Sequence, residues 1–136
     1  MKIIADAATI VALIDKRDSF HQWASTQVAN LPIPFFTCEA VISESCYLLH
    51  NIHQGEKTVL TYLKKGILRI DFSLSNEIEA VENLMQKYKS VPMSLADACL
   101  VRMSELMDNS TVFTLDSDFH IYRKNGRQKI PLIIPE

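Results

Sequence analysis

The chain has 136 residues, of which 48% are hydrophobic and 22% are charged, and its formal net charge is −2. This composition is that of a globular protein rather than a disordered one, and the length predicts a single domain over residues 1–136. The slightly acidic balance excludes a protein that binds nucleic acid through overall basic charge, so a polyanionic substrate would need a metal ion or clustered Lys and Arg residues.

The sequence contains three cysteines, Cys38, Cys46 and Cys99, and no C-x-x-C pair. An odd number without paired spacing argues against a disulfide framework or a zinc ribbon, and it indicates buried, reduced thiols. No apolar run approaches the length of a membrane span, and no signal peptide is visible. We therefore expect a cytoplasmic protein that does not associate with membranes.

Apolar periodicity and turn residues predict strands that alternate with helices along the chain. The predicted strands cover residues 2–5, 33–37, 67–72, 111–115 and 131–134. The predicted helices cover residues 9–14, 19–30, 39–52, 56–65, 76–89 and 95–107, and the candidate caps are Asp18 or Ser19, Thr37 and Ser94. Residues 123–129 read as a polar turn. Alternation of this kind predicts a mostly parallel sheet that is covered by helices on both faces.

Two of the predicted strands end in an acid. Asp6 follows the first strand, and Asp116 closes the strand over residues 111–115. The carboxyl ends of parallel strands meet at one edge of a sheet, where open α/β folds bind their ligands. Asp6 can equally be a loop acid that caps the following helix. Asp118 comes two residues after Asp116 and points the same way in an extended segment, so either of these residues can be the acid at that position.

Two predicted helices can bring further acids to the same edge. Glu44 lies at the margin of the apolar face of helix 39–52, where a side chain either reaches into a cleft or is simply solvated. Asp97 comes three residues after Ser94, which is the spacing of a capping box, and the helix dipole alone explains an acid there. Four carboxylates that converge on one rim would form a metal site.

The sequence lacks the motifs of several other catalytic classes. It has three glycines and neither a G-x-x-x-x-G-K-[ST] nor a G-x-G-x-x-G motif, which excludes a glycine loop that cradles phosphate. Ser43, Ser45 and Ser94 have no G-x-S-x-G context, so a serine hydrolase has no support. His50 and His53 are three residues apart without a third ligand nearby, which favours two surface histidines over a metal pair.

Four segments carry a family resemblance: residues 3–9 (IIADAAT), 42–49 (ISESCYLL), 94–101 (SLADACLV) and 113–119 (FTLDSDF). Their order and spacing resemble the PIN-domain family of metal-dependent ribonucleases, in particular its small VapC-type toxins, over essentially the whole chain. The resemblance implies a single PIN-like domain, folded as a three-layer α/β/α sandwich with a mostly parallel central sheet. The chain departs from the family pattern at Ala7, where a Thr or Ser commonly follows the first acid.

The resemblance also implies a function, that of a divalent-metal-dependent endoribonuclease and the toxin of a toxin–antitoxin pair. The implied catalytic acids, which are also the implied metal ligands, are Asp6, Glu44, Asp97 and Asp116. The ion would be Mg²⁺ or Mn²⁺, which prefer oxygen ligands. Thr114 would orient a carboxylate or a water, and Asp118 is the alternative to Asp116.

The implied partners are an RNA substrate, a small antitoxin that offers Arg or Lys to the acids, and a second copy of the chain in a homodimer. Candidate contacts to RNA phosphates, which are otherwise solvated surface charges, are Arg102, Lys124, Arg127 and Lys129. A catalytically inactive PIN-like module that binds RNA or a protein is the alternative function, and Ala7 keeps it open. A receiver-type phosphoacceptor domain is disfavoured because Ala5, rather than a second acid, precedes Asp6.

Overall fold

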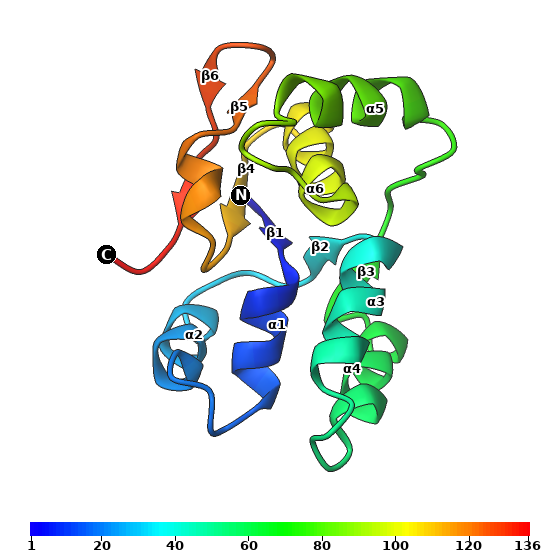
Figure 1. Ribbon diagram of the computed structural model, residues 1–136. Coiled ribbons are helices and arrows are strands. Elements are labelled where there is room, and N and C mark those ends of the chain that lie inside the picture. The colour runs from blue at the N-terminus through cyan, green and yellow to red at the C-terminus, as the bar shows by residue number, and fades with distance from the viewer.

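The computed structural model describes residues 1–136, and its centre is a sheet of five strands (Figure 1). The strands lie in the order β3-β2-β1-β4-β7, and every adjacent pair is parallel. Their bounds are β1 (Lys2–Ala5), β2 (Phe35–Thr37), β3 (Leu68–Ile70), β4 (Ser110–Phe113) and β7 (Leu132–Ile133). The chain therefore extends the sheet from β1 to β3 on one side and then returns to add β4 and β7 on the other.

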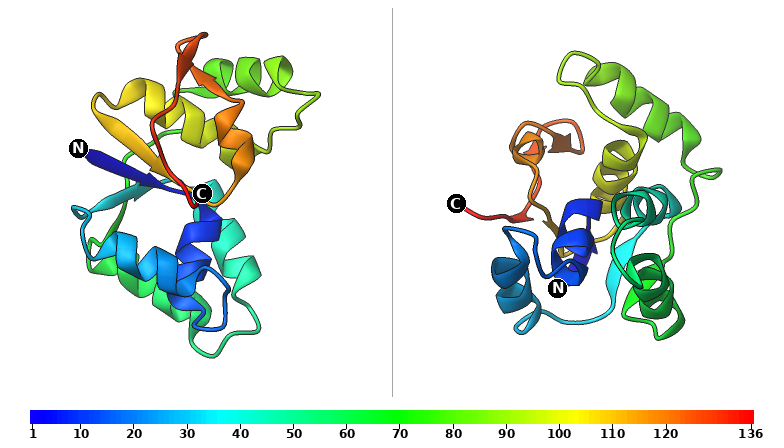
Figure 2. Two further views of the ribbon diagram at one scale, coloured as in Figure 1. Left: turned by 90° about the vertical axis from the view of Figure 1, so that its left-hand side faces the viewer. Right: turned by 60° about the horizontal axis from the view of Figure 1, so that its bottom comes forward.

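Helices cover both faces of this sheet. Their bounds are α1 (Ala7–Ile14), α2 (His21–Val28), α3 (Glu39–Leu48), α4 (Gly55–Lys64), α5 (Ile78–Lys87) and α6 (Leu95–Leu106). In Figure 1, α5 and α6 lie above the sheet and α1, α2 and α4 lie below it, and the side view in Figure 2 shows the same two layers. The predicted fold class, an α/β/α sandwich with a mostly parallel central sheet, is confirmed.

The strand order creates a switch point between β1 and β4. From β1 the chain continues to β2 on one side, whereas β4 lies on the other side of β1, with Ala5 opposite Phe113. Ligands of open α/β sheets bind outside the carboxyl ends of the strands at such a point. Asp6 directly follows β1 and Asp116 follows β4, so the fold brings two of the predicted acids to this position.

The middle of the sheet is apolar because helices cover both of its faces. Ile3 and Ile4 of β1 and Phe113 of β4 are completely buried. All three cysteines are free, and Cys38 and Cys99 are buried, so the prediction of reduced, buried thiols is confirmed for these two. None of the helices combines the length and the apolar character that a membrane crossing requires.

Three predictions about helix ends are wrong. Helix α2 begins after Phe20, which makes no side-chain cap, and the carboxylate of Asp18 instead accepts a hydrogen bond of 2.8 Å from the Phe20 N–H. Thr37 does not cap α3, because its buried hydroxyl donates to the carbonyl of Ala5 at 3.2 Å and ties β2 to the end of β1. Helix α3 ends at Leu48 rather than at residue 52.

The segment after β4 is more ordered than the predicted polar turn. It contains a short 3₁₀ helix, η1 (Ser117–His120), and an antiparallel hairpin formed by β5 (Arg123–Lys124) and β6 (Gln128–Lys129). The hairpin lies beside α5 and α6 at the top of Figure 1. It is separate from the main sheet, to which the chain returns as β7.

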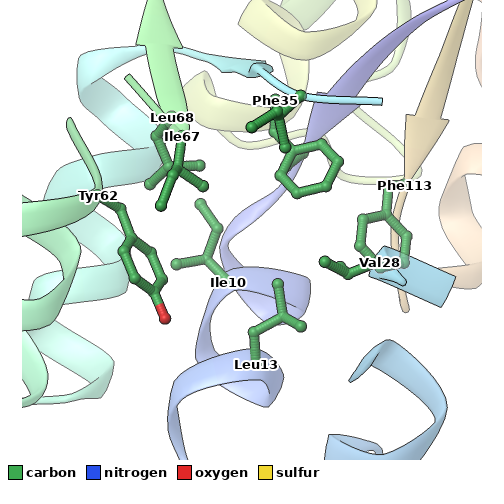
Figure 3. A pocket seen from close by; sticks show the side chains of 10 residues that line it. Ile10, Leu13, Val28, Phe35, Tyr62, Ile67, Leu68 and Phe113 are labelled. Atoms are coloured by element: carbon green, nitrogen blue, oxygen red, sulfur yellow. The ribbon is translucent and has the colours of Figure 1, made fainter. Parts of the chain in front are cut away.

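A wholly apolar cavity of about 310 Å³ lies between the sheet and the lower helices (Figure 3). Its lining residues are Ala5, Ile10, Leu13, Val28, Ile33, Phe35, Tyr62, Ile67, Leu68 and Phe113. No carboxylate, imidazole or thiol lines it. The acid chemistry that the sequence predicts therefore belongs to another part of the molecule.

Candidate active site

Asp6 is both the residue at the end of β1 and the N-cap of α1. Its Oδ1 atom accepts hydrogen bonds of 3.0 Å from the backbone N–H and from the hydroxyl of Thr9. The same hydroxyl lies 3.0 Å from the Asp6 carbonyl and 3.2 Å from the Phe113 carbonyl, so its single proton is shared among three acceptors. The capping role and the sheet-edge position, which the sequence left as alternatives, therefore occur together in one residue.

Thr114 connects Asp6 to the segment that follows β4. Its buried hydroxyl donates to Oδ2 of Asp6 and accepts a hydrogen bond of 2.9 Å from the backbone N–H of Asp116. Both carboxylate oxygens of Asp6 are thus held, one by α1 and one by β4. The orientation of the Asp6 side chain is therefore fixed by the fold before any ligand binds.

Burial makes the charged form of Asp6 unfavourable. The residue is only 6% exposed, and loss of hydration raises the pKa of its carboxyl to about 6. The hydrogen bonds from Thr114 and Thr9 lower this pKa, and the nearby charge of Asp116 raises it. A buried acid with a raised pKa at a sheet switch point is a candidate for function.

Asp97 lies in the first turn of α6 and forms the predicted capping box with Ser94. The Asp97 N–H donates to Ser94 Oγ at 3.0 Å, and the Ser94 N–H donates to Asp97 Oδ2 at 3.2 Å. Oδ2 also lies 3.4 Å from the hydroxyl of Tyr122, which is 3.1 Å from the Pro92 carbonyl. Burial raises the pKa of Asp97, the hydrogen bonds from Ser94 and Tyr122 lower it, and the charge of Asp116 raises it.

Glu44 approaches the same place from α3. This helix packs against α1, α4 and α6, so it contacts helices from both layers and stands where α1 and α6 begin. Glu44 itself is exposed. Partial burial of the carboxyl is the largest cause that raises its pKa, and the charges of Asp97 and Asp116 raise the pKa further. Glu44 lines the same cavity as Asp97 and Asp116.

These four acids line one small cavity of about 80 Å³, large enough for one or two waters or an ion with a water. The remaining lining residues are small or apolar: Ala7, Ala8, Val41, Ala96 and Leu100. Asp118 is not among the lining residues, and its backbone N–H caps the carboxylate of Asp116 at 2.9 Å. The fold thus brings together Asp6, Glu44, Asp97 and Asp116 and leaves Asp118 outside the cavity.

The residues of this acidic cavity fit a hard divalent cation in their chemistry. All the donors are carboxylate oxygens, which Mg²⁺ and Mn²⁺ prefer, and no histidine or cysteine is present. The charge of Asp116 raises the pKa of the other three acids, a repulsion that a divalent cation relieves. No three acidic, His or Cys side chains already stand at coordination distance from a common point. Binding would therefore require the acids to close on the ion.

Two residues that hold the acids were not predicted from the sequence. Thr9 occupies the third position of α1. A polar residue three positions after an acidic N-cap could have predicted this hydrogen bond from the sequence. Its hydroxyl supplies Asp6 with a hydrogen bond although the two residues after Asp6 are Ala7 and Ala8. Tyr122 had no such signal, because it lies 25 residues from Asp97 in the sequence.

Arg102 is not a free phosphate contact. Its guanidinium donates to Glu77 at 2.7 Å and to Glu105 at 3.0 Å, and these bonds raise its pKa. The two carboxylates satisfy the charge of Arg102 within the protein. Of the four predicted phosphate contacts, the three on the hairpin segment, Lys124, Arg127 and Lys129, form no ion pair.

Replacing Thr9 with Val is expected to weaken Mn²⁺ binding by about 10- to 100-fold, the usual effect of losing an outer hydrogen bond to a metal ligand. The substitution keeps the shape of the side chain and removes only the hydroxyl that holds Asp6 Oδ1. Isothermal titration with Mn²⁺ measures the effect. Thr9→Ser restores the hydroxyl and should bind nearly as well as the wild type. Equal affinities for the Val and Ser variants would show that this hydrogen bond does not position Asp6.

Comparisons with known proteins bear on the family and the fold of the chain. The sequence profile of the PIN domain matches residues 3–125. No curated protein matches the chain at a significant level. The crystal structure of Mycobacterium tuberculosis VapC20, a toxin that cleaves the sarcin–ricin loop, superposes with a TM-score of 0.74 over 86% of this chain and 92% of that chain, at 18% sequence identity. At this identity the likeness establishes a shared fold.

Proposed function

Because the chain belongs to the PIN domain family, we propose that it is a divalent-metal-dependent endoribonuclease and the toxin of a toxin–antitoxin pair. The observation that carries the proposal is the convergence of Asp6, Glu44, Asp97 and Asp116 on one cavity at the switch point of the sheet. The structural likeness to VapC20, which is described as a toxin that cleaves the sarcin–ricin loop, supports the same function.

The four acids would hold Mg²⁺ or Mn²⁺, which would supply an activated water and shield the negative charge of the scissile phosphate. Asp6 is suited to be a fixed ligand because α1 and β4 hold its two oxygens through Thr9 and Thr114. Asp97 is held from one side only, by its capping box and Tyr122, and keeps Oδ1 without a protein donor. Glu44 is exposed on α3 and is placed to contact the ion directly or through a water.

The reaction would be hydrolysis of an RNA phosphodiester. A water attacks phosphorus, the bond between phosphorus and one ribose oxygen breaks, and the leaving oxygen takes up a proton. The proton that the attacking water loses would pass to a carboxylate of the cavity or to solvent. No covalent intermediate with the protein is required.

The direct test is RNA cleavage with and without divalent cations. We expect internal cleavage of a labelled single-stranded RNA with Mn²⁺ or Mg²⁺ and none after treatment with EDTA. Readdition of Mn²⁺ to the treated protein should restore cleavage, which distinguishes metal loss from inactivation. Cleavage that continues undiminished in EDTA would contradict the proposal.

A catalytically inactive PIN-like module that binds RNA or a protein is the second candidate function. The observation in its favour is that no three acids already stand at coordination distance from one point. Titration with Mn²⁺ separates the two functions, because an inactive module would bind Mn²⁺ no better than its Asp97→Asn variant.

The proposed partners follow from the same surface. A small antitoxin would occupy the acidic cavity and offer Arg or Lys to the carboxylates. The proposed homodimer would use exposed apolar side chains, among which are Tyr47, Leu48 and Leu60 on α3 and α4. Co-purification with the product of an adjacent gene tests the antitoxin. The molecular mass of the protein in solution tests the homodimer.

A further inference from the structure

The β5–β6 hairpin carries the densest positive charge of the chain. Residues 123–129 contain Arg123, Lys124, Arg127 and Lys129 and no acid, in a protein whose net charge is −2. The loop between the two strands consists of Asn125, Gly126 and Arg127, and Asn125 and Gly126 both have positive φ (52° and 83°). We call this segment, together with Lys87 of α5, the basic hairpin.

The basic hairpin is fixed to the body of the protein. The Asn125 N–H donates to the Glu105 carboxylate at 2.7 Å, and the Lys87 ammonium donates to the Gly126 carbonyl at 3.1 Å. At the base of the hairpin, the Arg123 N–H donates to the hydroxyl of Tyr88 at 2.9 Å. Two of these contacts are to the C-terminal end of α5 and one is to α6, so the backbone of the hairpin is held in place before RNA binds.

The charges of the basic hairpin are not neutralised within the protein. Lys87, Lys124, Arg127 and Lys129 form no ion pair. Glu105, the one acid that contacts the hairpin, is shared with Arg102. Arg123 stands directly opposite Lys129 in the hairpin register, and its guanidinium donates to the carbonyls of His120, Ile121 and Tyr122. The side chains of Lys124, Arg127 and Lys129 therefore remain available to a bound polyanion.

The basic hairpin also begins beside the acidic cavity. Tyr122, the residue before β5, has its hydroxyl 3.4 Å from Asp97 Oδ2. The hairpin turn contacts Glu105, which lies eight residues after Asp97 on α6, or about 12 Å along the helix. The basic hairpin therefore begins beside the acids, and its turn contacts α6 about 12 Å further along that helix.

We propose that the basic hairpin binds the phosphate backbone of the RNA on one side of the scissile bond. This assignment rests on the proposed nuclease function and specifies where the substrate lies. The cations would contact phosphates rather than bases, so they would give affinity and register without selecting a sequence. They would also offset the repulsion between RNA and a chain of negative net charge.

The test replaces three cations at once, in the variant Lys124→Gln/Arg127→Gln/Lys129→Gln. A matched control, Lys57→Gln/Lys64→Gln/Lys65→Gln, makes the same change of charge on α4, on the opposite side of the sheet. Binding of a labelled single-stranded RNA is followed by fluorescence anisotropy in EDTA at several salt concentrations. Steady-state cleavage with Mn²⁺ gives kcat and KM for the same proteins.

We expect the hairpin variant to bind RNA at least about tenfold more weakly, with a salt dependence that is shallower by about 2 because three phosphate contacts are lost. Its KM for cleavage should rise while kcat changes little, since the hairpin lies away from the reacting atoms. The α4 variant should match the wild type in both measurements. Equal affinity, salt dependence and KM for the hairpin variant and the wild type would overturn the assignment, as would an equal loss in the α4 variant.

The experiment distinguishes a failure of the hairpin assignment from a failure of the proposed nuclease function. If the hairpin variant cleaves RNA as the wild type does, the nuclease function stands and the hairpin has no part in it. If the wild type binds RNA through the hairpin but cleaves no RNA with Mn²⁺, the hairpin is an RNA-binding surface and the nuclease function is wrong.

Discussion

Asp6→Asn is expected to reduce RNA cleavage with Mn²⁺ by more than about 100-fold, which exceeds the usual loss from an outer partner of a metal ligand. Asn keeps the size of the side chain, and its amide oxygen can still accept from Thr9 or Thr114. The substitution removes the negative charge that would hold the cation at the end of β1 and replaces one of the two acceptor oxygens with an amide donor. Initial rates with a labelled RNA measure the effect, and a thermal melt shows whether the variant is folded.

Asp118→Asn is the matched control for this experiment. Asp118 follows β4 as Asp116 does, but it lies outside the acidic cavity. Its variant should cleave RNA within a few-fold of the wild type. Rates that fall equally in both variants, or a folded Asp6→Asn protein with undiminished activity, would contradict the assignment of Asp6.

The stability of the metal-free protein should show the cost of burying Asp6. Its pKa is raised from 3.8 to about 6 in the folded state, so the fold favours the protonated carboxyl. A raised pKa contributes stability that is fully present below the unfolded pKa, near 4, and is lost as the pH rises through about 6. The loss corresponds to about 2–3 kcal/mol for a shift of this size.

Urea unfolding in EDTA between pH 4 and pH 7.5 measures this contribution. The free energy of unfolding of Asp6→Asn minus that of the wild type should increase as the pH rises, and this difference should become constant above pH 7. Taking the difference between the two proteins cancels most of the titration of the other acids. A difference that is the same at every pH would mean that Asp6 is not destabilised by its burial.

Local patterns placed three of the four acids, and the family resemblance added Glu44, which the helical pattern alone left as either a cleft residue or a solvated one. Asp6 and Asp116 follow apolar strands, and Asp97 follows Ser94 at the spacing of a capping box, which the structure contains. Their convergence follows from parallel strands that share one edge. The choice between Asp116 and Asp118 required the three-dimensional structure, because η1 turns the chain after Asp116 and leaves Asp118 outside the cavity.

The contacts between distant segments could not be predicted in the same way. Thr114 donates to Asp6 across 108 residues, and Arg102 reaches Glu77 across 25, and no periodicity encodes such pairs. The hairpin had a local signal in Asn125-Gly126, but charged residues flank it rather than alternating apolar ones. Its order comes from tertiary anchors on Lys87, Tyr88 and Glu105.

In the proposed function, the acidic cavity would hold the cation and the basic hairpin would hold the RNA. The charge of Asp116 raises the pKa of Glu44 and of Asp97, and such crowding of negative charge favours a cation and disfavours RNA without one. The cations of the hairpin are separated from them along α6. An RNA would therefore be held at the hairpin and cut at the acids.

Diffraction from crystals soaked in Mn²⁺, collected at the manganese absorption edge, tests the account most directly. We predict an anomalous peak in the acidic cavity, bonded to oxygens of Asp6 and Asp97 and within reach of Glu44 and Asp116. A cavity without a peak at a saturating concentration of Mn²⁺, or a peak only at other residues, would contradict it.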